Sequence, residues 1–539
     1  MSTTPLAQRL GAWLPPLALA LLVLLGCNRG LWTPDEPREA EISREMALSP
    51  GIIPTLNGER FIEKPPLYYW TVAAVFRLTG GPSVLGARAV SVAAAAATLA
   101  ILVIWGSAAH SRAAGWLAAL MLASSVQFLV SSHWVLIDPL LMMTTTLAAW
   151  AGWELLARRD SWLLRLQLYG ALILALWIKG LIGPVLIGAG LLAFVAVDRP
   201  THWRRLRPIA CLSVLLLAVL LLALAIWKQG GNDALWEWAY VNHVQRLINP
   251  AGSSGHRQPL LYYTWTLPFA LLPWLLPLVE ALRPAHWRRV RLVNLTELAD
   301  PARFGAIMSG AMLLVLSASA TKRETYLLPL LPLIFLWLGI RTHEWWQQWQ
   351  LRGDASAGAG WWLQAVLLAI YALAVPIGAW IWLRSFNPWV VVTLLAALLC
   401  VAALFYYSVT VQRLRAGPAA MSCAVAGAVI VLLLAPLLLN HMKDMAPFVR
   451  TIDRSLPADQ PVYALGIDET LRAEFPFYTG RTVVPIKPAQ RPEWIVQQDN
   501  HDNRAVDLAP DYVLTNRQSF GSHRTLELWR LAAAGANPP

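Results

Sequence analysis

The sequence contains few charged residues and few cysteines for its length. Only 14% of its 539 residues are Asp, Glu, Lys or Arg, whereas 57% are hydrophobic. So few charges do not suit the surface of a soluble protein, and so apolar a chain is not intrinsically disordered. The cysteines lie far apart in apolar runs without metal-binding spacing, which excludes a disulfide scaffold and a zinc–thiolate site. They are Cys27, Cys211, Cys400 and Cys423.

Long apolar runs are what the sequence has in abundance. Each run is about 17 to 25 residues long, enough for a helix to cross a hydrocarbon core of about 30 Å. They predict an all-α polytopic membrane protein with about thirteen transmembrane helices. No internal repeat of fixed period is visible, which disfavours a transporter built from two matching halves. The predicted spans are residues 11–27, 85–107, 113–133, 139–157, 163–178, 180–197, 208–227, 260–281, 303–320, 325–341, 361–383, 388–410 and 419–440.

The first span ends in Leu24-Leu25-Gly26-Cys27, which resembles the cleavage box of a lipoprotein signal. A chain that goes on to cross the membrane repeatedly needs no cleaved signal. We therefore expect the first span to be an uncleaved helix.

Membrane topology explains the net charge of +12. Arginines crowd alternate short loops, as at Arg204, Arg205 and Arg207, and the positive-inside rule places these loops and the N-terminus in the cytoplasm. An odd number of spans then puts the C-terminus outside. Because topology accounts for the arginines, no nucleic-acid partner is predicted.

Three predicted outer segments are too long to be simple turns. Loops of this length usually fold or carry function. The last of them contains alternating, strand-like runs separated by helical stretches, at 461–466, 481–486 and 512–514. We therefore expect a transmembrane domain of residues 1–440, including outer loops 28–84 and 228–259, and a small periplasmic α/β domain of residues 441–539.

The first outer loop carries two acidic residues, Asp35 and Glu36, just before Pro37. Proline favours the first turn of a helix, where backbone N–H groups and the helix dipole stabilise a carboxylate. Three- and four-residue apolar spacing through Met46 predicts an amphipathic helix along the membrane surface. The two acids are either catalytic groups or the acidic start of an anchoring helix.

The same loop continues with Glu63 and Lys64 before Pro65-Pro66. The prolines fix the backbone and so the direction of Lys64. A lysine at head-group level suits a phosphate ligand, although lysines also snorkel to this depth without one. Asp138 opens the fourth span on the same outer side, where a carboxylate is costly unless it faces a cavity or a partner. It is either functional or a helix cap.

Later outer loops add further candidates. Four residues could cradle phosphate or lipid head groups, or equally anchor the chain at the membrane surface. They are Arg246, Lys322, Arg323 and Tyr326. Glu63 and His243 could ligate a divalent metal from two loops, although two ligands do not define a site. Lys179, between two spans, is expected to anchor a turn.

Together these motifs resemble a known family. D-E-x-R-x-A-E-I-S-R-E-M from Asp35, F-x-E-K-P-P from Phe61, and Asp138 opening the fourth helix are similar to motifs of the GT-C membrane glycosyltransferases. The chain most resembles the lipid A 4-amino-4-deoxy-L-arabinose transferases, which are related to the protein O-mannosyltransferases. The resemblance covers about the first 340 residues by motif and the rest by architecture. The chain departs from the family at Glu39, since tyrosine often follows the motif arginine.

The resemblance implies a site and a reaction. Asp35 would be the principal catalytic carboxylate, Glu36 its companion and Asp138 a further catalytic acid. The residues implied to contact the phosphate or lipid head of the donor are Arg38, Lys64 and Tyr68. The reaction would move aminoarabinose from undecaprenyl phosphate to a lipid A phosphate at the periplasmic face of the bacterial inner membrane. This change would give resistance to polymyxin and other cationic peptides.

The acceptor constrains the role of Asp35. A hydroxyl acceptor needs a general base because it loses a proton as it attacks, whereas a phosphate is already an anion near pH 7. Asp35 would then hold the ammonium group of the sugar, orient the acceptor or stabilise charge at the anomeric carbon, and we expect direct displacement with inversion.

Two other functions stay open. Another polyprenyl-phosphate-sugar transferase, like the protein O-mannosyltransferases, would differ in its acceptor. A lipid transporter would need charges deep inside several helices. Membrane lipids are expected partners, no cofactor beyond the possible metal is predicted, and the sequence leaves the oligomeric state open.

Overall fold

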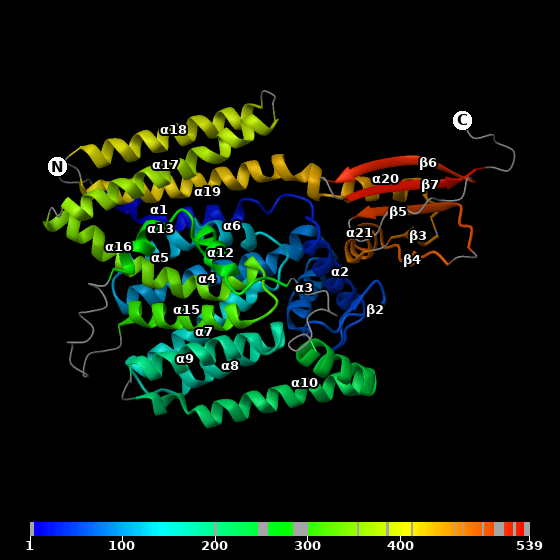
Figure 1. The fold of residues 1–539 in the computed structure, drawn as a ribbon, viewed down its shortest axis with the longest axis horizontal. Coiled ribbons are helices and arrows are strands. Elements are labelled where there is room, and N and C mark those ends of the chain that lie inside the picture. The colour runs from blue at the N-terminus through cyan, green and yellow to red at the C-terminus, as the bar shows by residue number, and fades with distance from the viewer. Residues whose placement is uncertain are drawn as a thin grey trace.

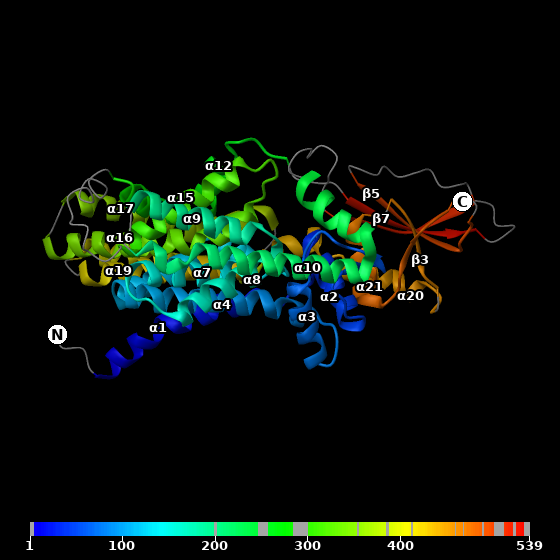
Figure 2. The ribbon, with the colours of Figure 1, turned by 90° about the horizontal axis from the view of Figure 1, so that it is seen from below.

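The structure is a computed structural model that describes residues 5–532 apart from 199–201, 246–256, 284–299, 353–354, 384–386, 411–412, 459, 467, 488–489, 501–510 and 521–523. Most of its long helices run along the long axis of the molecule, and a small sheet domain stands at one end of this bundle (Figure 1). Helix α1 (Pro5–Leu24) begins toward the opposite end (Figure 2).

The apolar segments expected from the sequence are helices. Within the described residues, nine helices are long and apolar enough to cross a membrane, and two bent pairs raise this number to eleven. Two shorter apolar helices, Pro15–Leu24 and Ile182–Asp198, coincide with the two predicted spans that are left. The expected polytopic helical architecture is therefore confirmed. After α1, the bundle contains α4 (Val84–Ala109), the bent pair α5 (Arg112–Ala123) and α6 (Val126–Ser132), α7 (Asp138–Ala157), α8 (Trp162–Lys179), α9 (Ile182–Asp198), η1 (Trp203–Leu206), α10 (Pro208–Trp236), η2 (Glu237–Gln245), the bent pair α12 (Tyr262–Leu271) and α13 (Leu275–Ala281), α15 (Pro301–Ala318), η5 (Glu324–Leu330), α16 (Leu331–Arg352), α17 (Ala355–Leu383), α18 (Pro388–Val409) and α19 (Arg413–Lys443).

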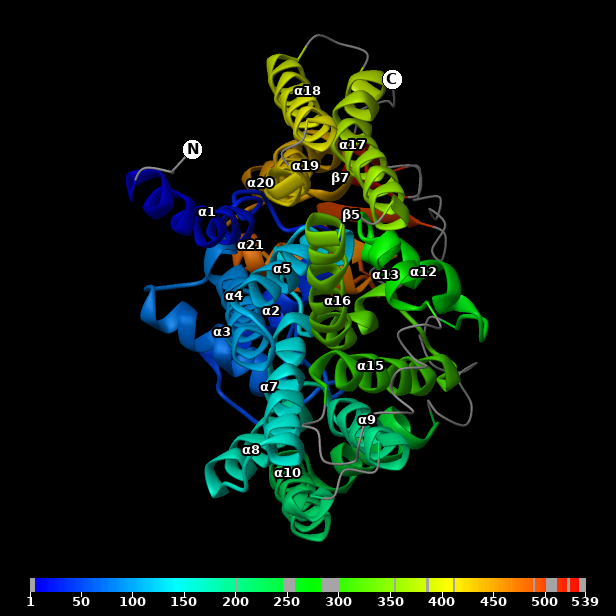
Figure 3. The same cartoon turned by 90° about the vertical axis from the view of Figure 1, so that its left-hand side faces the viewer.

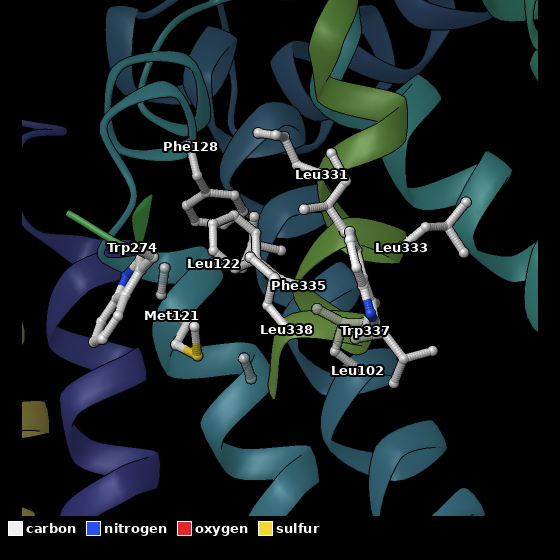
Figure 4. Close-up of a cluster of buried hydrophobic side chains, with 14 of the residues drawn as sticks. Leu102, Met121, Leu122, Phe128, Trp274, Leu331, Leu333, Phe335, Trp337 and Leu338 are labelled. Atoms are coloured by element: carbon white, nitrogen blue, oxygen red, sulfur yellow. The ribbon is translucent and has the colours of Figure 1, made fainter. Parts of the chain in front are cut away.

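Helix α16 is central to the bundle. It continues η5, and the apolar stretch of this combined segment, Glu324–Leu351, is 83% buried. The side chain of Phe335 in α16 lies in one apolar cluster with Leu122 of α5 and Phe128 of α6 (Figure 4). Small residues let the backbones approach closely, since a Cβ on Gly339 of α16 would lie 2.7 Å from Ala118 of α5. Lipid provides no hydrophobic drive for helices to associate, so contacts of this kind stabilise the bundle.

Helices α10 and α18 lie at the periphery (Figure 3). Only 17% and 22% of their apolar stretches are buried inside the protein. Leu216 and Leu220 of α10 and Leu399 of α18 are all more than half exposed. These side chains are stable at such positions because lipid tails, rather than water, surround them.

The loop of residues 28–84 folds into α2 (Asp35–Leu48), β1 (Thr55–Leu56), β2 (Glu59–Arg60) and α3 (Leu67–Leu78), between the bundle and the sheet domain (Figure 1). The predicted helix at α2 is confirmed, but its apolar side chains are covered by protein. Nine of its 14 residues are buried. It packs against α3 and against α21 of the C-terminal domain, so its apolar side chains, such as Ile42, contact protein rather than lipid.

The predicted C-terminal α/β fold is also confirmed. Its elements are α20 (Ala446–Ser455), β3 (Val462–Leu465), α21 (Glu469–Thr479), β4 (Val483–Pro485), β5 (Trp494–Asn500), β6 (Tyr512–Phe520) and β7 (Arg524–Leu531). The strand order is β4-β3-β5-β7-β6, with β3 parallel to both neighbours and β7 antiparallel to both of its own. Helical spacing lets Phe448 and Ile452 of α20 share one apolar core with Leu526 and Leu528 of β7.

Candidate functional site

A group of charged side chains surrounds the start of α2, on the side of the bundle that faces the sheet domain. Ion pairs join three cations and three carboxylates, so the group is electrically balanced. The loop of residues 28–84 supplies four of the six residues, and the turn before η5 and the start of α21 supply one each. We call this group the charged cluster: Asp35, Arg38, Glu39, Lys64, Arg323 and Glu469.

Asp35 is the first residue of α2 and is only 5% exposed. Arg323 donates to both of its carboxylate oxygens, and Arg38 Nη2 donates to Oδ1 at 3.1 Å. Burial alone would raise the pKa of Asp35, but hydrogen bonds and positive charge from Arg323, together with Arg38 and Lys64, hold it at about 2. Asp35 is therefore an anion near neutral pH and a weak base.

Glu39, the residue at which the chain departs from the family motif, is buried in the middle of the cluster. Its Oε1 accepts hydrogen bonds from Lys64 Nζ at 2.6 Å and Arg38 Nη2 at 2.9 Å, and its Oε2 accepts one from Tyr69 OH at 2.8 Å. Burial would raise the pKa of Glu39, but the charges of Lys64 and Arg38 outweigh it and lower that pKa. Glu39 therefore determines where both cations lie.

Glu36 lies beside Asp35 in sequence but in a different environment. Its carboxylate is fully buried and accepts hydrogen bonds from Arg29 and Arg88, as well as from the backbone N–H groups of Trp32 at 2.7 Å and Val135 at 2.9 Å. Arg88 in turn donates to three carbonyls of the loop that leads into α2. Glu36 therefore joins α2, α4 and the segment before α7, which is a structural arrangement.

Asp138 forms a second ion pair on this side of the bundle. Its Oδ1 accepts a hydrogen bond from Lys179 Nζ at 2.6 Å, and the same ammonium lies 4.4 Å from the ring centroid of Tyr326. Asp138 makes no cap, because Ile137 is the N-cap of α7 and has no side-chain cap bond. The helix-cap alternative for Asp138 is therefore wrong, and Lys179 is an ion-pair partner as well as a turn residue. The charge of Asp138 also acts on Arg323, so this pair lies within electrostatic reach of the cluster.

Two residues expected to contact phosphate point elsewhere. Tyr68 is fully buried, and its hydroxyl lies 3.5 Å from Ser91 Oγ inside the protein. Lys322 is also buried, and its ammonium donates to the carbonyls of Gln258 and Ser319. In this arrangement neither side chain joins the charged cluster.

The predicted metal ligands are only partly described. Arg246, a predicted phosphate contact, and the side chain of His243 lie outside the described residues. Over the part of the chain that the structure describes, no group of three or more His, Cys, Asp or Glu side chains could hold a metal ion. The divalent metal at Glu63 and His243 stays a prediction.

Comparisons with known proteins show which sequences this chain is similar to. Residues 17–229 match the model of the dolichyl-phosphate-mannose-protein mannosyltransferase family. The undecaprenyl phosphate-alpha-4-amino-4-deoxy-L-arabinose arabinosyl transferase of Pseudomonas paraeruginosa is 31% identical over 329 residues, which cover 57% of this chain and 55% of that protein. The transferase of the same name from Yersinia pestis is 31% identical over 331 residues, which cover 59% and 57%. The alignments thus span a little over half of these relatives.

Solved structures extend the similarity to the whole fold. The crystal structure of ArnT from Cupriavidus metallidurans bound to undecaprenyl phosphate matches 99% of this chain and 100% of its own, with a TM-score of 0.74 and 19% identity. The apo structure of the same protein matches equally well, with a TM-score of 0.74. At this identity the likeness establishes the fold. With the sequence matches, it confirms the resemblance to the aminoarabinose transferases that the loop motifs indicated.

Proposed function

We propose that this chain, a relative of the aminoarabinose transferases in fold and in sequence, transfers 4-amino-4-deoxy-L-arabinose from undecaprenyl phosphate to a phosphate of lipid A. The arrangement that carries the proposal is a buried, anionic Asp35 between two guanidinium groups, beside Lys64, at one end of an apolar bundle. Both substrates are lipids with charged heads, so they need a charged surface next to a membrane. A cationic sugar on lipid A weakens its attraction for polymyxin, which gives resistance.

The electrostatics favour an anionic acceptor. A pKa of about 2 makes Asp35 a poor proton acceptor, so it is badly suited to activating a hydroxyl. A phosphate acceptor has no such need. We assign Asp35 to the developing positive charge at the anomeric carbon or to the ammonium of the sugar, and Arg38, Arg323 and Lys64 to the leaving polyprenyl phosphate. Direct displacement with inversion follows, and a covalent sugar on Asp35 would contradict it.

The orientation is part of the proposal. A cytoplasmic N-terminus is supported by the arginine-rich loops and agrees with the start of α1, which lies at the end of the bundle opposite the sheet domain (Figure 1). In this orientation the charged cluster and residues 441–539 face the periplasm, while residues 1–440 form the transmembrane domain. The membrane is the bacterial inner membrane.

The acceptor distinguishes this function from its nearest alternative. We expect purified protein in vesicles, given undecaprenyl phosphate-linked aminoarabinose, to modify lipid A and to leave dephosphorylated lipid A and a serine- and threonine-rich peptide unmodified. Mass spectrometry of the three acceptors gives the result. Transfer to the peptide instead would favour a protein O-mannosyltransferase-like enzyme.

Replacing Arg323 with glutamine should make the transfer rate fall at low pH relative to wild type. Without its main cation, burial of Asp35 has a larger effect, so the pKa of this carboxyl rises from about 2. Asp35 in the variant therefore loses its charge as the pH falls, whereas wild-type Asp35 stays ionised. The measurement is the initial rate from about pH 8 to about pH 5, with each protein scaled to its own rate at the upper pH. Identical relative rates at the lower pH would show that Arg323 does not control Asp35.

A further inference from the structure

The C-terminal domain reaches the charged cluster through Glu469, the first residue of α21. Glu469 Oε2 accepts a hydrogen bond from Arg38 Nη1 at 2.8 Å. The other terminal nitrogen of Arg38, Nη2, donates to Asp35 at 3.1 Å and to Glu39 at 2.9 Å. The guanidinium is thus held on two sides, by the membrane domain on one and by the C-terminal domain on the other.

The sheet fixes the backbone that carries Glu469. The preceding residue, Asp468, is the N-cap of α21, and its Oδ1 accepts a hydrogen bond from Leu471 N at 2.9 Å. Its Oδ2 accepts hydrogen bonds from Gln498 Nε2 of β5 at 2.8 Å and from Arg524 Nη2 of β7 at 2.7 Å. Two strands therefore hold the start of the helix, and Glu469 is presented to Arg38 from a rigid support.

Other contacts hold the domain against the outer loop. Asn57 forms two hydrogen bonds with the backbone of Val483, at 2.7 and 3.0 Å, and Arg472 forms an ion pair with Glu59 at 2.9 Å. Ala473 of α21 belongs to the same apolar cluster as the buried side chains of α2 and α3. Replacing the half-exposed Glu469 thus removes its hydrogen bond with Arg38, while these other contacts still hold the C-terminal domain against the loop.

We propose that Glu469 is a positioning residue for the transfer reaction: it holds the Arg38 guanidinium in the orientation that keeps Nη2 on Asp35 and Glu39. The inference rests on the proposed function for its kinetic consequence. Arg38 Nε is buried without a hydrogen-bond partner, so Nη1 and Nη2 fix the plane of the group. Without Glu469 the guanidinium is held on one side and can turn, and small misplacements of charged groups in an active site cost up to about 10²-fold in rate.

The test compares Glu469→Ala with the conservative Glu469→Gln, whose amide oxygen can still accept a hydrogen bond. We expect Glu469→Ala to lower kcat about tenfold, with the KM for the donor and the melting temperature close to wild type. The kcat of Glu469→Gln should lie between that of wild type and that of Glu469→Ala. The matched control is Arg472→Gln, which removes the neighbouring interface ion pair and should leave kcat unchanged. Wild-type kcat in Glu469→Ala, or equal losses in Glu469→Ala and Arg472→Gln, would overturn the proposal.

A second measurement needs no catalysis, so it separates this inference from the proposed function. Arginine labelling by phenylglyoxal is followed by mass spectrometry of the peptide that contains Arg38. In wild type the side chain of Arg38 is only 15% exposed, and we expect slow labelling. Labelling should be several times faster in Glu469→Ala and unchanged in Arg472→Gln. Equal labelling of Glu469→Ala and wild type would contradict the positioning role even if transfer itself were not observed.

Discussion

Replacing Asp35 with asparagine should abolish most of the transfer activity and leave a folded protein. The side chain keeps its size, but the negative charge between Arg38 and Arg323 is lost. Electrostatic groups that act at the reacting centre contribute about 10² to 10³ in kcat, so a loss of this size is expected. The measurement is kcat with undecaprenyl phosphate-linked aminoarabinose and lipid A, at matched protein amounts.

The fold should tolerate this change because the partners of Asp35 have alternatives. Arg38 keeps Glu39 and Glu469, and the Arg323 side chain is 29% exposed and can be solvated. A variant that stays folded, with kcat within about threefold of wild type, would show that Asp35 is not the catalytic carboxylate.

Replacing Glu36 with alanine should have the opposite signature, a large loss of stability. The side chains of Arg88 and Arg29 are 0% and 3% exposed, so they would stay buried without their carboxylate. Removing one partner of a buried ion pair costs about 3 to 5 kcal/mol, because the remaining charge is unpaired. Two backbone N–H groups would also lose their acceptor. The measurements are the melting temperature in detergent and the yield of folded protein from the membrane.

Asp35→Asn is the control for this experiment, since the two acids are neighbours in sequence. We expect Glu36→Ala to fall well below Asp35→Asn in both melting temperature and yield. If Glu36→Ala instead folded like wild type and lost only activity, Glu36 would have a chemical role, and the structural interpretation would be wrong.

The difference between Asp35 and Glu36 also shows which features could be predicted from the sequence and which could not. The apolar runs predicted the helices because a span needs only local composition and length. The motifs around Asp35 and Lys64 indicated the candidate site because both lie in the same loop, residues 28–84. The sequence could not separate Asp35 from Glu36, since adjacent residues on a helix point about 100° apart and only tertiary packing decides which faces the site.

The same limit applies to other residues around the charged cluster. Tyr68 was expected at the ligand and is buried, whereas its neighbour Tyr69 reaches Glu39. The sequence predicts Arg323 as a possible phosphate ligand, but it does not predict the pairing with Asp35, which joins residues 288 positions apart. Glu469 carried no local signal at all, because its contact with Arg38 spans 431 positions and depends on the docking of a separate domain. Pairings of this length follow from the fold rather than from any motif.

The proposed function is tested most directly by the mass of lipid A from cells that lack an aminoarabinose transferase and carry this gene or its Asp35→Asn form. We expect a gain of one aminoarabinose or more with the wild-type gene, and none with Asp35→Asn at equal protein level. Unmodified lipid A in both strains would contradict the proposed substrates. Equal modification in both strains would support the proposed substrates and show that Asp35 is not the catalytic carboxylate.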